Sequence, residues 1–279
     1  MDRPIGGLSF VALHQKIGFL GFGNMGQAIG NGLLDARKIS HNQLVLHDLY
    51  PDTLESYAER GSILARSPAE LARLSDALLL ATKPQDMDAA LEDIEPENAG
   101  DTLYISIAAG LSISYFQKHL GDSARIIRVM PNTPAMVNAG AAAYALSDTC
   151  TDADEALAKA IFESIGIGVR VPESSLDAVT ALSGSGPAYY FYLVECFVDA
   201  GVELGLSEKQ ATELAVQTLY GAGKMLKDTG ESAATLREKV TSKGGTTFAA
   251  LESFRKDELE KIVFNAMKAA ADRSRELWK

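Results

Sequence analysis

The stretch from Lys16 to Gly26, "KIGFLGFGNMG", decides the fold of this chain. A short apolar run, typical of a buried strand, leads into G-x-G-x-x-G at Gly21, Gly23 and Gly26, and a helical pattern follows. In dinucleotide-binding folds the first glycine makes a tight turn, the second lets the backbone approach the pyrophosphate, and the third permits close helix–strand packing. The free amides of the helix N-terminus then bind phosphate. Because a strand and a helix frame the glycines, we interpret them as a dinucleotide fingerprint rather than a purely structural turn.

The rest of the N-terminal half alternates apolar runs with helical patterns. Further strands are predicted at "QLVLHD", "SILA", "ALLLATKP", "TLYISIAAG" and "RIIRVMPN", with a last short strand at "IGVRV". Such alternation is typical of a parallel, doubly wound sheet. We therefore predict an α/β protein whose Rossmann-type dinucleotide-binding domain covers residues 16–175, preceded by a flexible extension of residues 1–15.

The pattern becomes all-helical after about Thr180. The long apolar segment "PAYYFYLVECFVDAGVELG" ends at Gly205, and "SEKQ" (Ser207 to Gln210) has the form of a capping box that opens another helix. Two more helical stretches cover about 246–255 and 257–277. We predict a second, helical domain over residues 176–279.

The charge balance and the cysteine count exclude several classes of protein. With 37 acidic and 26 basic residues the 279-residue chain carries a net charge of −11, which disfavours nucleic acid and anionic membrane surfaces as partners. The two cysteines form no C-x-x-C motif and no Cys/His cluster, so neither a disulfide framework nor a metal site is expected. No apolar run approaches the roughly 20 residues that span a bilayer. We expect a cytoplasmic protein without a metal.

Other candidate cofactor residues follow the predicted strands. Asp48 ends the second strand, where an acidic residue binds the adenosine ribose diol and disfavours a 2′-phosphate. It can equally be a solvated aspartate before a turn, so NADH and NADPH both stay open. "ATKPQ" (81–85) and "IAAG" (107–110) end later strands at the edge where ligands bind, or make ordinary strand-to-helix turns.

The stretch "TSKGGTT" (241–247) interrupts a helical region with two glycines, each of which costs a helix about 1 kcal/mol relative to alanine. We interpret Gly244 and Gly245 as clearing side chains so that backbone amides at a helix N-terminus hold a carboxylate. Ser242, Thr246 and Thr247 would add hydroxyl donors. The alternative is a plain corner between helices with Thr246 or Thr247 as the N-cap.

The helical half has no histidine, and its glycine-rich segment lacks the lysine that hydroxyacid dehydrogenases of similar layout use to protonate an alkoxide. No histidine follows His119, and "SGSGPAYYFY" (183–192) holds no lysine. A protonated imine, in contrast, needs only hydride and a hydrogen-bonding partner for its nitrogen, which a hydroxyl supplies. The pattern thus favours an imine as substrate.

Five motifs together resemble the pyrroline-5-carboxylate reductase family: "GFGNMGQAI", "TKPQ", "RVMPNTPA", "SGSGPAY" and "VTSKGGTT", in this order over about residues 16–275. The resemblance implies reduction of 1-pyrroline-5-carboxylate to L-proline with NADPH or NADH, the last step of proline biosynthesis. It also implies that the helical domain forms a homodimer, that dimers assemble into a larger homo-oligomer, and that the substrate loop borders helices of the neighbouring subunit.

The resemblance assigns roles to particular residues. Those expected to bind the cofactor are Leu20, Gly21, Phe22, Gly23, Asn24 and Met25 at the pyrophosphate, Thr82, Lys83 and Pro84 along the groove, and Ala108 and Ala109 beside the nicotinamide. Those expected to bind the substrate are Ser242, Gly245, Thr246, Thr247 and Glu231, with the Thr247 hydroxyl on the ring nitrogen as the catalytic contact and the Thr246 amide on the carboxylate. Asp48 and Pro68 depart from the family pattern and leave the cofactor preference open.

Two other functions fit the same sequence. The first is an NAD(P)-dependent 3-hydroxyacid dehydrogenase of similar architecture, in which Lys224 or Lys243 would have to act as the acid. The second is a nucleotide-sensing protein that binds the cofactor without turnover.

Overall fold

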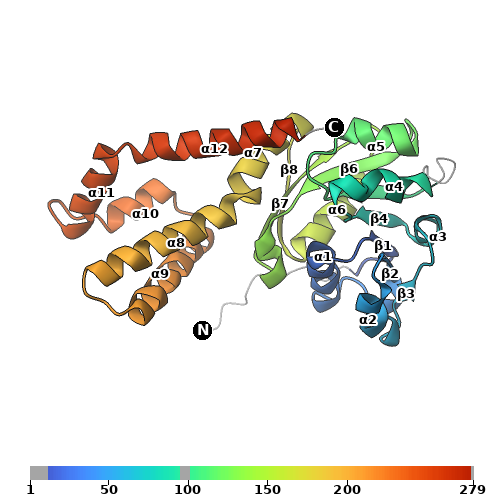
Figure 1. Ribbon diagram of the computed structural model, residues 1–279, viewed down its shortest axis with the longest axis horizontal. Coiled ribbons are helices and arrows are strands. Elements are labelled where there is room, and N and C mark those ends of the chain that lie inside the picture. The colour runs from blue at the N-terminus through green and yellow to red at the C-terminus, as the bar shows by residue number, and fades with distance from the viewer. Residues whose placement is uncertain (1–11, 95–100, 278–279) are drawn as a thin grey trace. The chain divides into compact units, whose positions relative to one another are not determined.

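The computed structural model of the chain describes residues 12–94 and 101–277 (Figure 1). Most of the extension expected at residues 1–15 lies outside the described residues. The chain divides into two compact units: Met1–Gly184 with Ala271–Lys279, here called the sheet unit, and Ser185–Ala270, here called the helical unit. Within the described ranges, no helix combines the length and apolarity needed to cross a membrane.

The sheet unit is built on one eight-stranded sheet in the order β3-β2-β1-β4-β5-β6-β7-β8. Its strands are β1 (Ile17–Leu20), β2 (Leu44–His47), β3 (Ile63–Leu64), β4 (Ala77–Leu80), β5 (Leu103–Ser106), β6 (Arg125–Met130), β7 (Gly140–Leu146) and β8 (Gly166–Arg170). Neighbouring strands are parallel except β6 and β7, which are antiparallel. The predicted doubly wound α/β class is confirmed, with the last two strands, β7 and β8, running opposite to the other six.

Helices cover both faces of the sheet. They are α1 (Asn24–Asp35), α2 (Glu55–Glu59), α3 (Pro68–Leu74), α4 (Met87–Glu92), α5 (Ile113–Leu120), α6 (Asp152–Glu163) and α7 (Leu176–Val179). Successive strand residues point to opposite faces, so Leu78 and Leu80 join a core with α3, α4 and α5, whereas Leu79 joins the core with α1 and α6. Burial on both faces explains why the central strands are continuous apolar runs in the sequence.

The strand register brings the predicted motifs to one edge of the sheet. Leu20 at the end of β1 pairs with His47 on β2 and with Leu80 on β4, and Leu80 pairs with Ser106 at the end of β5. The carboxyl ends of these parallel strands therefore lie side by side. This edge is where a doubly wound sheet binds its ligand.

Strand β7 was not predicted. Its sequence "GAAAYAL" is rich in alanine, which is depleted in strands. The strand forms because β6 pairs with it on one side and β8 on the other. Gly140 and Gly166 also lie so close that a side chain on Gly166 would overlap the Gly140 backbone. Tertiary pairing, rather than local propensity, makes this strand.

The helical unit contains α8 (Gly186–Glu203), α9 (Glu208–Thr229), α10 (Ala233–Lys239) and α11 (Thr246–Lys256), and α12 (Leu259–Glu276) returns to the sheet unit at its end. The predicted capping box at the start of α9 is confirmed, since Ser207 and Gln210 each bond the other's backbone. The short helix α10 was not predicted. Short 3₁₀ segments lie at His41–Gln43, Pro51–Leu54, Pro84–Asp86, Thr133–Val137 and Glu173–Ser175, and a π-helical turn, η7, at Thr180–Gly184.

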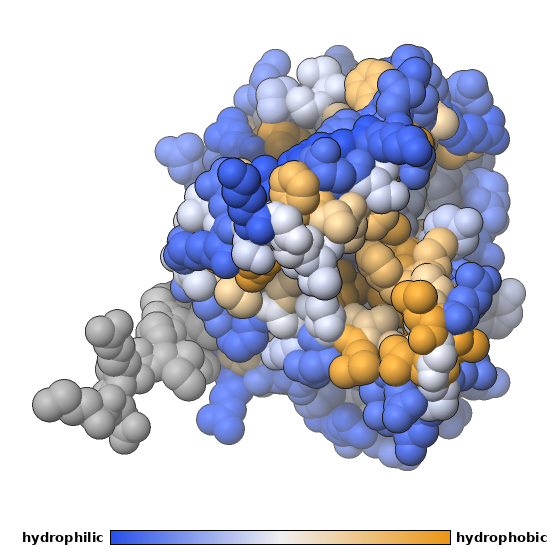
Figure 2. Space-filling view, turned by 90° about the vertical axis from the view of Figure 1, so that its left-hand side faces the viewer, coloured by the Kyte–Doolittle hydropathy of each residue, from blue (hydrophilic) through white to orange (hydrophobic). Residues whose placement is uncertain are grey.

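The helical unit has almost no apolar core of its own. Among its described residues, the buried apolar side chain is that of Ala211. Large apolar side chains are exposed instead, including Phe191 (61%), Tyr220 (63%) and Phe264 (65%). Figure 2 shows hydrophobic residues gathered on a face of the molecule. Exposed apolar surface of this extent is typical of an interface with another chain.

Candidate functional site

The first glycine of the fingerprint lies where three strands end. Gly21 has φ +87°, and a Cβ there would lie 3.0 Å from the backbone of both Ala81 and Thr82. Its amide donates to the His47 carbonyl at 2.9 Å. Residues from β1, β2 and β4 are thus tied together at one point, and only glycine fits the conformation and the space.

The second and third glycines leave the phosphate path open. Gly23 is the N-cap of α1, and a Cβ built on it would meet no atom within 4 Å. The first turn of this helix carries no acidic residue. On Gly26 a Cβ would lie 2.9 Å from the Gly21 carbonyl oxygen, so the helix packs closely on the turn. An open, uncapped helix N-terminus over a bare glycine fits a diphosphate.

Asp48 at the end of β2 supports the glycine turn. Its Oδ2 accepts from the Phe22 amide at 2.6 Å, and its Oδ1 accepts from the Tyr50 amide at 2.9 Å. The buried Phe22 ring packs edge-on against Phe19 and Tyr57. A ribose diol would therefore meet a carboxylate that already accepts two backbone hydrogen bonds.

Two exposed apolar residues beside Asp48 were not singled out from the sequence. Leu49 is 77% exposed and Tyr50 74%. They follow the strand end at which an adenosine would bind, and a flat tyrosine ring suits a purine face. These two residues could have been identified from the sequence as an apolar pair that directly follows an acidic residue at the end of a strand.

The remaining predicted cofactor residues line the ends of β4 and β5. The Thr82 hydroxyl contacts the Met87 sulfur at 3.4 Å, Lys83 is exposed, and Pro84 begins a 3₁₀ turn. The Ala108 amide donates to the Ser106 hydroxyl at 3.2 Å, and the next residue, Ala109, is exposed. These residues are brought to the same edge as the glycine turn by the strand register.

The loop at 241–247 leads into helix α11, whose first residues differ from the alternative in which a threonine caps the helix. The N-cap of α11 is Gly245, so the alternative with Thr246 or Thr247 as the cap is wrong. Gly245 has no side chain with which to cap, and the first intrahelical bond here joins the Ala249 amide to the Gly245 carbonyl at 3.1 Å. The amides of Thr246, Thr247 and Phe248 are left for another acceptor.

The two glycines of this loop have different reasons to be glycine. Gly244 has φ +71°, in the left-handed region, and a Cβ there would meet nothing within 4 Å. On Gly245 a Cβ would overlap the Ser242 hydroxyl, which folds back over the turn. The Ser242 carbonyl accepts from the Gly245 amide at 3.0 Å. The sequence interpretation of a cleared backbone corner fits this geometry.

Glu231 is anchored near the same loop. Its carboxylate forms an ion pair with Lys239, at the end of the helix that precedes the loop. Its amide donates to the Thr229 hydroxyl at 3.2 Å. The predicted substrate residues thus belong to the helical unit, and the predicted cofactor residues to the sheet unit.

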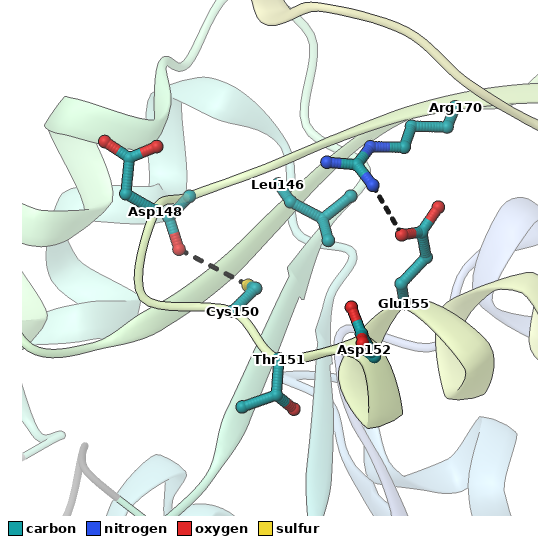
Figure 3. A pocket seen from close by; sticks show the side chains of 8 residues that line it. Leu146, Asp148, Cys150, Thr151, Asp152, Glu155 and Arg170 are labelled. Atoms are coloured by element: carbon teal, nitrogen blue, oxygen red, sulfur yellow. Dashed lines mark hydrogen bonds and ion pairs between the residues drawn. The ribbon is translucent and has the colours of Figure 1, made fainter.

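A separate polar cavity of about 250 Å³ lies at the opposite edge of the sheet, lined by Leu146, Ser147, Asp148, Cys150, Thr151, Asp152, Glu155 and Arg170 (Figure 3). Arg170 and Glu155 form an ion pair at 2.6 Å across it. Burial raises the pKa of the Cys150 thiol, which makes it a poor nucleophile at neutral pH. The cavity contains none of the predicted site residues.

No cluster of three or more His, Cys, Asp or Glu side chains is placed to hold a metal ion within residues 12–94 and 101–277.

The fold and the geometry of the glycine turn together define a class of protein. This is an α/β protein with an N-terminal dinucleotide-binding fold and a helical second part.

Comparison with known proteins narrows the class to one family. Residues 16–110 match the family described as NADP oxidoreductase, coenzyme F420-dependent, and residues 173–277 match the pyrroline-5-carboxylate reductase dimerisation family. The chain is 39% identical over 267 residues to the pyrroline-5-carboxylate reductase of Methanosarcina acetivorans, with 95% of this chain and 99% of the relative covered. It is 35% identical over 268 residues to that of Escherichia coli, with 96% and 100% covered. The chain belongs to the pyrroline-5-carboxylate reductase family.

Solved structures are similar over 96% of this chain. A pyrroline-5-carboxylate reductase from Coxiella burnetii is similar at a TM-score of 0.91 and 33% identity, covering 96% of this chain and 100% of that one. The enzyme from Plasmodium falciparum, solved with NADP bound, is similar at a TM-score of 0.83 and 32% identity with the same coverage. The resemblance found from the sequence motifs is confirmed.

Proposed function

We propose that this chain reduces the C=N bond of 1-pyrroline-5-carboxylate to give L-proline, using NADPH or NADH. Membership of the family supports the reaction. The structural observation that carries it is the open N-terminus of α11, where Thr247 stands beside backbone amides that have no side-chain cap.

The cofactor would be held by the sheet unit. Bound NADPH or NADH supplies the hydride. The amides at the start of α1 would bind the pyrophosphate over the bare Gly23, and residues 82–84 and 108–109 would line the groove to the nicotinamide. Tyr50 and Leu49 would flank the adenine.

The loop at 241–247 would hold the substrate. The amides of Thr246 and Thr247 point from a helix N-terminus, where partial positive charge favours a carboxylate. The Thr247 hydroxyl would bond the ring nitrogen of the protonated imine, which takes up the electron pair of the C=N bond while the ring carbon receives hydride. Ser242 and Gly245 would shape the loop, and Glu231 would border the ring.

A single assay tests the reaction and the cofactor preference together. Consumption of NADH and of NADPH is followed with pyrroline-5-carboxylate at matched concentrations. If Asp48 binds the ribose diol, its negative charge would oppose a 2′-phosphate. We then expect a higher kcat/KM with NADH than with NADPH, and Asp48→Ser should reduce this difference between the two cofactors. Absence of any imine-dependent turnover would refute the reaction, whereas a clear NADPH preference would refute only the role of Asp48.

The alternative function, a 3-hydroxyacid dehydrogenase, is disfavoured because neither of its two candidate acids, Lys224 and Lys243, has the environment of a catalytic acid. Lys224 has a side chain that is 57% exposed and ion-paired with Asp228, whose hydrogen bond raises the pKa of the lysine. A catalytic acid for neutral pH needs a lowered pKa instead. Lys243 is an exposed loop residue. A pure nucleotide sensor would bind the cofactor in the same assay without turning over the imine.

We also propose that the minimal active form is a homodimer made by the helical unit, and that dimers assemble further. The unit matches a dimerisation family and exposes its apolar side chains, so a second copy would complete its core. Sedimentation should give at least twice the chain mass of 29.8 kDa. Phe264→Glu, which places a charge on that apolar surface, should lower the mass and the activity together; an active monomer would contradict the proposal.

Residues 16–175 would bind the cofactor, and residues 176–279 would bind the substrate and form the oligomer. The two cysteines, Cys150 and Cys196, are both unpaired, which suits a reducing compartment such as the cytoplasm.

A further inference from the structure

The π-helical turn η7, at Thr180–Gly184, has a carbonyl that its own helix cannot satisfy. The donor four residues after Ser183 would be Pro187, which has no N–H. The donor five residues after it, the Ala188 amide, bonds the Ser185 carbonyl at 3.0 Å instead. A π-helical turn of this kind is rare and is frequently found at functional sites.

Asn132 supplies the missing donor from another part of the fold. Its Nδ2 donates to the Ser183 carbonyl at 3.0 Å, and its Oδ1 accepts from the Ala141 amide at 2.8 Å. The residue is 9% exposed. Both ends of the amide are therefore used, and one buried side chain joins the π-turn to the start of β7.

The same segment makes a second contact with the turn. The terminal methyl of Met130, the last residue of β6, fills the space beside Gly184 where a side chain would otherwise lie. Within the turn, the hydroxyls of Thr180 and Ser183 bond carbonyls four residues back, at 2.8 Å to Leu176 and 3.2 Å to Val179. Residues 130–132 thus hold an already braced turn against the sheet.

This contact lies at the point where the chain leaves the sheet unit. Gly184 is the last residue of that unit before the boundary, and the helical unit begins at Ser185. β6 is parallel to β5, so Asn132 follows the strand end at the cofactor edge. The backbone that Asn132 fixes therefore lies at the first of the two places where the chain passes between the units; the second is within α12, between Ala270 and Ala271.

We infer that Asn132 is a positioning residue for the reduction: its amide replaces the N–H that Pro187 lacks and so fixes the backbone at the first of the two places where the chain passes from the sheet unit to the unit that carries Thr247. This inference rests on the proposed function. Hydride transfer needs the donor and acceptor carbons placed to within a fraction of an ångström, and a misplacement of about 1 Å can cost a hundredfold in rate. Asn132 would act on placement without touching substrate or cofactor.

A double-mutant cycle between Asn132→Ala and Pro187→Ala tests this. The Pro187→Ala change restores a backbone N–H four residues after Ser183, so it can replace the lost amide donor. With Pro187 present, we expect Asn132→Ala to lower kcat/KM for pyrroline-5-carboxylate about tenfold, and to leave the Kd for NADPH within about twofold. In the Pro187→Ala background, the same change should cost less than about threefold. Pro172→Ala, which lies outside this contact, is the matched second background and should leave the tenfold loss intact.

The readouts separate the possible failures. An equal cost of Asn132→Ala with and without Pro187→Ala, or a wild-type rate for Asn132→Ala, would overturn the inference. So would a loss of rate that matches a loss of folded protein by circular dichroism, or a weakened Kd for NADPH of the same size. If the unmutated protein does not reduce the imine at all, the proposed function has failed, whatever the cycle shows.

Discussion

Gly23→Ala is expected to weaken NADPH binding about a hundredfold while the protein stays folded. Its φ of −72° and ψ of −165° are open to alanine, and a Cβ there would meet no protein atom within 4 Å. The new methyl would instead occupy the path of the pyrophosphate. Two charge-assisted hydrogen bonds, worth about 1.5–3 kcal/mol each, would be stretched or lost, and about 2.7 kcal/mol is a hundredfold in Kd.

Gly21→Ala is the matched comparison, because it should lose stability as well as binding. Alanine at φ +87° is strained, and its Cβ would lie 3.0 Å from the backbone at Ala81 and Thr82, which cannot move as a side chain can. We expect a fall of about 1–3 kcal/mol in the free energy of unfolding. For Gly23→Ala the change should stay below about 1 kcal/mol. Fluorescence titration with NADPH and urea unfolding measure the two effects, and tight NADPH binding by Gly23→Ala would remove Gly23 from the phosphate site.

The glycine turn could be predicted from the sequence because its requirements are local. A positive φ, an open approach and a close helix contact each demand glycine, and a strand and a helix frame them. The capping box at Ser207 could be predicted for the same reason, and so could the parallel sheet, from the alternation of apolar runs with helical patterns. The loop at 241–247 was recognised for a related reason, since two glycines within a helical region have no cheap local explanation.

What could not be predicted depends on contacts between distant residues. Strand β7 is an alanine-rich segment that becomes a strand because β6 and β8 pair with it. Asn132 has no local signal either, because the carbonyl it serves lies 51 residues away and is left open by a proline. The alternative that Thr246 or Thr247 is the N-cap of α11 was based on the preference for hydroxyl side chains at this position, and it is wrong. The N-cap is Gly245, which has no side chain, so the first amides of the helix stay free.

Thr247→Ala is expected to lower kcat/KM for pyrroline-5-carboxylate ten- to hundredfold, the effect of one hydrogen bond worth about 1–3 kcal/mol. Fold and cofactor affinity should not change, because Thr247 is the second residue of α11 and alanine is the better helix former. Thr247→Val keeps the shape without the hydroxyl and should behave like Thr247→Ala. Thr247→Ser keeps the hydroxyl and should recover most of the rate.

A second variant separates the hydroxyl from the amides around it. Thr246 is the first residue of α11, where proline is well tolerated, and Gly245 before it is extended (φ −79°, ψ 178°), as a residue preceding proline should be. Thr246→Pro therefore removes one amide donor with little cost to the helix, and it should raise KM for the imine more than it lowers kcat. Ser253→Ala, later on the same helix, is the control and should change neither. If Thr247→Ala leaves the rate unchanged, or Thr246→Pro leaves KM unchanged, the substrate does not bind at this helix end, because a carboxylate and a ring nitrogen held there would lose one contact in each variant.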